Sequence, residues 1–142
     1  EALLTDPAEA LKFYEATGVD TLASAVGTVH GIIKIRGGVT PQVDIKRIGQ
    51  IHEKVNIPLV LHGASGVDEN ITAEAIKNGI AIINIDTELR IAYSDALRKS
   101  LVDQPEEVDP RHIMKPVIEA VKQVAEKKLK QFGTKNVVVS SK

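Results

Sequence analysis

Two histidines stand at equivalent places in the sequence, each after an apolar stretch and each directly before a glycine. They are His30, in the segment 27–31, and His62, in the segment 62–66. Neutral imidazole is a preferred zinc ligand, and two imidazoles from neighbouring strand ends can reach one ion. A catalytic zinc normally has three protein ligands, so another ligand has to come from elsewhere. A histidine after a strand is more often a hydrogen-bonded, partly buried side chain, and both interpretations stay open.

Two further polar clusters follow apolar stretches and are suited to binding an anion. The turn at 63–66 precedes a predicted helix, so its backbone N–H groups and the Ser65 hydroxyl can hold a phosphate, although glycines there also make tight turns. Asp86 and Thr87 can cap a helix, which is their commoner use, or hold phosphate or substrate hydroxyls. Together the clusters indicate a zinc site beside a phosphate site, hence a phosphorylated substrate with a carbonyl that the metal polarises.

Short apolar strands that alternate with amphipathic helices must position these clusters. We predict helices over 7–17, 43–55, 69–78, 87–101 and 110–132, and strands over 21–26, 57–61 and 81–85. This alternation is typical of parallel strands covered by helices. The carboxyl ends of parallel strands open on one face, so we expect the clusters to meet there.

The predicted fold class is α/β, with two architectures open. Three strands are too few to close a barrel, but a TIM barrel takes about 250 residues, so this chain can supply roughly its second half. An open Rossmann-like sheet is the rival, although no GxGxxG motif opens a helix after a strand. We expect residues 133–142 to form a flexible tail.

Composition excludes several classes of protein. The sequence has 18 Lys and Arg residues and 19 Asp and Glu residues. It therefore has no excess of positive charge with which to bind nucleic acid independently of its sequence. The absence of cysteine excludes a disulfide scaffold and any thiolate chemistry, and fits a reducing compartment. No apolar run approaches the ~18 residues needed to cross a bilayer. We therefore expect a cytoplasmic protein with no membrane or nucleic-acid partner and, because it begins at Glu1, part of a longer chain.

The strand-end motifs resemble, in their order, those of the class II (zinc-dependent) fructose-bisphosphate aldolases. The motifs are GTVHG (27–31), LVLHGASG (59–66), INIDTE (83–88) and a late DPR (109–111), and the resemblance covers about 5–132. It implies a TIM (β/α)8 barrel, of which residues 1–142 supply about the last three strands and the C-terminal helices. It also implies a lyase of glycolysis and gluconeogenesis that reversibly cleaves fructose 1,6-bisphosphate to dihydroxyacetone phosphate and glyceraldehyde 3-phosphate.

The resemblance assigns roles residue by residue. His30 and His62 match the family's zinc ligands. Lys34 resembles a cation beside the substrate phosphate, and Arg90 and Arg111 resemble arginines for the far phosphate, Arg111 across a dimer interface. The residues that match contacts to the dihydroxyacetone phosphate unit are Gly31, Gly63, Ala64, Ser65, Asn84, Ile85, Asp86 and Thr87. The family's proton-shuttling acid and first zinc histidine lie on an earlier strand, so no catalytic acid is assigned here and the chain alone is expected to be inactive.

The implied cofactor is Zn²⁺, and the resemblance leaves a monovalent cation requirement open. The implied partners are a phosphorylated ketose, further copies in a homodimer or higher homo-oligomer, and the N-terminal half of the same barrel. One alternative is a tagatose-bisphosphate aldolase, although Asp86 favours the fructose substrate. Another is a noncatalytic half-barrel that binds sugar phosphate or pairs with another chain through exposed strand edges. His52 and His112 fall on predicted helices, and we expect both to be solvated.

Overall fold

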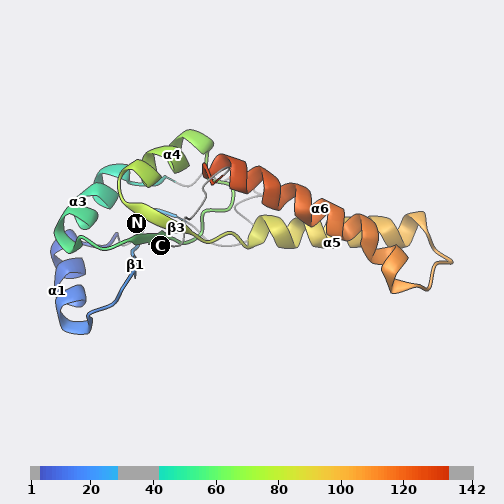
Figure 1. Cartoon of the computed structure of the whole chain (residues 1–142), viewed down its shortest axis with the longest axis horizontal. Helices are drawn as coiled ribbons and strands as arrows, with labels where there is room; N and C mark the ends of the chain where they lie inside the picture. The colour runs from blue at the N-terminus through green and yellow to red at the C-terminus, as the bar shows by residue number, and fades with distance from the viewer. Residues whose placement is uncertain (1–3, 29–41, 135–142) are drawn as a thin grey trace, which may run out of the picture. The chain divides into compact units, whose positions relative to one another are not determined.

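Figure 1 shows the computed structural model of the protein, in which the structure describes residues 4–28 and 42–134. Its elements are α1 (Pro7–Thr17), β1 (Leu22–Ala23), α3 (Ile45–Val55), β2 (Leu59–Leu61), α4 (Glu69–Lys77), β3 (Ile80–Ile83), α5 (Thr87–Asp103) and α6 (Pro110–Gln131). The chain divides into two compact units, residues 1–86 and 87–142. No helix in the described part of the chain is long and apolar enough to cross a bilayer.

The first unit holds a three-stranded parallel sheet in the order β1-β2-β3. Leu59 of the central strand pairs with Leu22 on one side and with Ile80 on the other, and the register shifts between Leu59 and Val60. All three residues of β2 are buried, because the strand has a neighbour on each side and helices over it. The predicted α/β class with parallel strands is confirmed.

Buried apolar residues of α3 form the centre of this unit. Ile48, Ile51 and Val55 recur at helical spacing, so they lie on one face of α3, and each is at most 2% exposed. They share one cluster with Leu59 and Leu61 of the central strand. Burying one such side chain contributes about 1.5–3 kcal/mol, so this cluster fixes the helix on the sheet.

A close approach of two backbone segments requires glycine at residue 27. Gly27 has φ +95°, and a Cβ atom there would lie 1.9 Å from the carbonyl oxygen of Gln42. Next to this contact, the Asp44 N–H donates to the Val26 carbonyl over 2.8 Å. The carboxyl end of the first strand region is thus tied to the start of α3.

The second unit is a hairpin of α5 and α6 (Figure 1). Asp109 is the N-cap of α6, where its side chain accepts from the Arg111 N–H, and Pro110 occupies the first turn. The buried residues of the two helices are Ser100, Val117 and Lys128. The Ser100 hydroxyl donates to the Ile113 carbonyl over 2.8 Å, which ties the helices together near the connection.

Several sequence predictions need correction at their edges. The strands are shorter than predicted: 21–26 contracts to Leu22–Ala23 and 57–61 to Leu59–Leu61, while 81–85 becomes Ile80–Ile83. Parallel pairing ends where a neighbouring strand ends, which an apolar pattern alone does not reveal.

The expectation of a solvated His52 is also wrong. Its ring is half-buried, Nδ1 lies 3.2 Å from the Ile57 carbonyl oxygen, and the ring packs against Gly79.

Candidate active site

The carboxyl ends of β2 and β3 bring His62 and Asn84 together. The Asn84 N–H donates to the carbonyl of buried Leu61 over 3.1 Å, which extends the pairing of the two strands by one step. The Asn84 side-chain Nδ2 then lies 3.4 Å from both Nδ1 and Nε2 of His62. Both side chains are exposed, so an imidazole and an amide face solvent side by side at this end of the sheet.

The turn after His62 is tightly built, and its two central residues are buried. Gly63 and Gly66 have φ values of +63° and +72°, a region that favours glycine, while Ala64 and Ser65 between them are buried. The Val67 N–H donates to the Ala64 carbonyl over 3.1 Å and closes the turn. Ser65 is therefore a fixed part of the turn rather than a mobile surface hydroxyl.

Helix α4 begins after this turn and has a carboxylate at its start. The Asp68 side chain accepts from the N–H groups of Asn70 and Ile71 over 2.8 and 3.4 Å. These N–H groups belong to the first turn of the helix, so Asp68 already provides their acceptor. The N–H groups predicted to hold a phosphate are those of the turn at 63–66, which comes before the helix.

The other predicted site residues fall into three groups. Ile85 packs against the core of the first unit, and Asp86 is exposed at the end of that unit. Thr87, Arg90 and Arg111 belong to the second unit, where Thr87 begins α5 and both arginines are exposed. The residues that lie outside the described part of the chain are His30, Gly31 and Lys34.

Arg111 is held by the carboxylate that caps its own helix. Its Nε lies 3.0 and 3.1 Å from the two carboxylate oxygens of Asp109, and Nη2 contacts the same group. The Arg111 guanidinium, followed by its backbone N–H, lowers the pKa of Asp109. A guanidinium has five N–H groups, so this pairing leaves the Nη1 side able to donate to a phosphate.

A second carboxylate organises the connection before α6. Glu107 accepts from the N–H groups of Val108 and Asp109 over 2.9 Å each, and its other oxygen lies 2.9 Å from His112 Nδ1. The N–H of Asp109 and then His112 lower the pKa of Glu107. His112 is exposed, as expected, and its ring is paired with Glu107.

Among the described residues, His62 can supply one ligand to a zinc ion. His62 offers an exposed imidazole at a strand end, which is the donor that zinc prefers. Residues 4–28 and 42–134 contain no group of three or more His, Cys, Asp or Glu side chains placed to share an ion. The donor chemistry of His62 therefore fits zinc, while a complete ligand set needs residues beyond those described.

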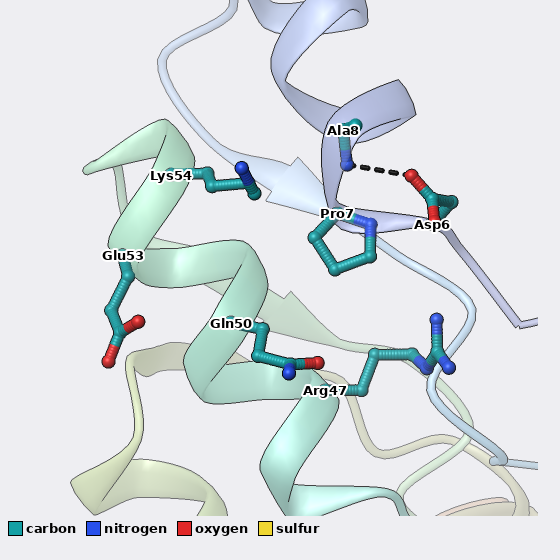
Figure 2. Close-up of a pocket in the computed structure, with 7 residues that line it drawn as sticks. All are labelled: Asp6, Pro7, Ala8, Arg47, Gln50, Glu53 and Lys54. Carbon is teal, nitrogen blue, oxygen red and sulfur yellow. Dashed lines mark hydrogen bonds between the residues drawn. The ribbon is translucent and has the colours of Figure 1, made fainter.

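A pocket of about 640 Å³ lies elsewhere, between the start of α1 and the side of α3 (Figure 2). Its lining residues are Asp6, Pro7, Ala8, Arg47, Gln50, Glu53 and Lys54. Arg47 donates to the Thr5 carbonyl over 2.9 Å and pairs with Asp44 at 3.3 Å. None of the predicted site residues lines this pocket. The sequence did not predict this pocket, because charged residues are common on helix surfaces and do not by themselves indicate a pocket.

Comparison with known proteins gives the same family from sequence and from structure. The family described as fructose-bisphosphate aldolase class-II matches residues 1–137. The crystal structure of the YdjI aldolase from Escherichia coli K12 is 36% identical, with a TM-score of 0.72 over 93% of this chain and 46% of that one. A putative fructose-1,6-bisphosphate aldolase from Coccidioides immitis is 29% identical, with a TM-score of 0.76 over 96% and 45%.

A third structure supports the fold alone. The fructose-bisphosphate aldolase from Campylobacter jejuni is 21% identical, with a TM-score of 0.73 over 92% of this chain and 45% of that one. The chain thus spans just under half the length of each of these proteins. The match over residues 1–137 shows that the chain belongs to the class II fructose-bisphosphate aldolase family.

Proposed function

We propose that this chain is the C-terminal part of a zinc-dependent aldolase whose whole protein reversibly cleaves fructose 1,6-bisphosphate. The products are dihydroxyacetone phosphate and glyceraldehyde 3-phosphate. The observation that carries the proposal is the pairing of His62 with Asn84 at the carboxyl ends of two parallel strands, in a chain of this family. Ligands of α/β proteins bind at such strand ends.

The three strands form the last part of a (β/α)8 barrel in this proposal, and residues 1–142 form the C-terminal part of one domain, with 133–142 as its tail. Two observations support it. The chain covers 45–46% of its aldolase neighbours, and Ala81 and Ile82 of β3 are exposed. An apolar strand residue in solvent is typical of a sheet whose covering layer lies elsewhere. The N-terminal half of the barrel supplies that layer.

His62 holds the zinc ion together with His30 and a ligand from the N-terminal half. When bound, the ion supplies a Lewis acid that stabilises negative charge on the oxygens of the substrate. Asn84 fixes the orientation of the His62 ring or donates to a substrate oxygen, since its amide lies against both ring nitrogens.

The phosphorylated ends of the substrate bind to two groups of residues. The turn at 63–66, with Gly31 and Lys34, holds the phosphate of the dihydroxyacetone unit, which Asn84 to Thr87 contact. Arg90 and Arg111 hold the far phosphate, and Arg111 does so in a homo-oligomer. The Asp109 pairing supports this role for Arg111, because it fixes the guanidinium while leaving N–H groups to donate.

The test is an assay of fructose 1,6-bisphosphate cleavage by this chain combined with the N-terminal half of the barrel. We expect turnover that a chelator abolishes and that zinc restores. His62→Ala should remove turnover, whereas His52→Asn should retain it, because Asn can keep the contact to the Ile57 carbonyl. Chelator-resistant cleavage would overturn the proposal. Phosphate binding without cleavage would favour the noncatalytic half-barrel, and faster turnover of tagatose 1,6-bisphosphate would favour the other sugar.

A further inference from the structure

A buried lysine joins the two helices of the hairpin. Lys128, in the last turn of α6, is 7% exposed, and its Nζ lies 2.9 Å from Glu88 Oε2. The same nitrogen donates to Gln131 Oε1 over 3.1 Å. Lysine is almost never buried unless it is paired, because removing its charge from water is costly.

The partner of this lysine occupies a distinctive position. Glu88 lies in the first turn of α5, directly after Thr87 and two residues before Arg90. By contrast, Lys99–Asp103 and Lys122–Glu126 are exposed pairs that join residues four apart on one helix. The Glu88–Lys128 pair therefore links the start of α5 to the end of α6, which exposed pairs along one helix do not do.

Two buried polar contacts together set the register of the helices. The Glu88–Lys128 pair is near one end of the hairpin, and the hydrogen bond from Ser100 to the Ile113 carbonyl is near the other. Apolar packing alone tolerates sliding of one helix along another, whereas a shift here would leave a buried ammonium or hydroxyl unpaired. A buried ion pair adds little net stability compared with apolar residues, so register is the property it controls best.

We propose that Lys128 is a positioning residue for the phosphorylated substrate. Through Glu88 it holds the first turn of α5, and with it Thr87 and Arg90, in one arrangement against α6. This inference rests on the proposed function, which places those two residues at the substrate. A misplaced first turn weakens binding of the sugar phosphate more than it slows the bond cleavage, since zinc and the proton-shuttling acid act elsewhere.

The first experiment measures backbone order by NMR relaxation in this chain assembled with the N-terminal half of the barrel. The variant is the double substitution Glu88→Gln with Lys128→Met, which removes both charges, leaves neither unpaired and keeps side chains of similar length. We expect order parameters at residues 87–90 to fall from about 0.85 to below about 0.6, with helix content and Tm unchanged. Lys122→Met, which removes an exposed lysine from the same helix, should change nothing. Unchanged order at 87–90 would overturn the inference.

The second experiment uses the complete aldolase and separates binding from chemistry. Lys128→Met should raise KM for the bisphosphate about tenfold while kcat stays within about twofold of the wild-type value. Lys128→Arg, which keeps the positive charge, should have the wild-type KM. A fall in kcat alone, or no rescue by arginine, would contradict a positioning role. If the wild-type protein lacks cleavage activity, the proposed function fails, and the NMR result still decides whether Lys128 orders the start of α5.

Discussion

The two units of the chain are stabilised in different ways. In residues 1–86, one cluster of buried apolar side chains joins α1, α3 and α4 to the strands, with Ile48, Ile51 and Leu61 fully buried. In the α5–α6 hairpin, two of the three buried residues are polar, Ser100 and Lys128. The difference indicates that burial of apolar area stabilises the first unit, while directional contacts set the arrangement of the second.

A cavity in the first unit should give the largest loss of stability. Leu61→Ala removes a fully buried side chain from the central strand and should lower the free energy of unfolding by about 2–5 kcal/mol. Urea denaturation followed by circular dichroism measures the loss. Ile118→Ala, in the hairpin at a residue 63% exposed, should cost less than about 0.5 kcal/mol. Equal losses would contradict the comparison.

A glycine next to His52 tests how closely the first unit is packed. Gly79 has φ +112°, and a Cβ atom there would lie 2.3 Å from His52 Cγ. Gly79→Ala should therefore destabilise the unit by about 1–3 kcal/mol, measured by thermal unfolding. Gly18→Ala, at a positive φ with open space around it, should cost about 1 kcal/mol. A larger loss at residue 18 than at 79 would refute the packing argument.

Removing one directional contact tests the second unit. Ser100→Ala deletes the hydrogen bond to the Ile113 carbonyl and should cost about 1 kcal/mol, with faster amide exchange in the hairpin. Ser94→Ala, in the same helix, is the matched control and should change stability by less than about 0.5 kcal/mol. If the two substitutions have the same effect, the hydrogen bond does not hold the hairpin.

The smallest expected effect concerns pH. The pKa values of Glu107 and Asp109 are lowered in the folded hairpin. The two carboxylates therefore contribute fully to the free energy of unfolding above the pKa of an unfolded carboxyl group, about 4. This contribution is lost as the pH falls through their lower pKa values in the folded state. Thermal unfolding from pH 7 to pH 2 should show this acid loss. Asp109→Asn keeps a capping side chain and should weaken the pH dependence. A loss that begins near neutral pH would contradict the assignment.

Local signals made much of the fold predictable. The helix at Pro7–Thr17 has the predicted bounds, because Asp6 caps it, Pro7 begins it and Gly18 ends it in the left-handed region. The strands were predicted too long, because pairing depends on neighbours distant in the sequence. Lys128 was missed for the same reason: a lysine in a helix rich in charge normally faces solvent, and its burial depends on Glu88 in another helix.

The candidate site was predictable only in part. The rule that parallel strand ends share one face places His62 beside Asn84, as observed. The use of Asp68 to cap α4, and of Asp109 to hold Arg111, depends on side-chain directions that residue types do not reveal.

The most direct test of the central claim, that the strand ends of the first unit form a zinc site, is native mass spectrometry. The sample is this chain assembled with the N-terminal half of the barrel and supplied with zinc. We predict one zinc ion per assembled barrel, lost in His62→Ala and retained in His52→Asn. Zinc that stays bound after His62→Ala would contradict the account.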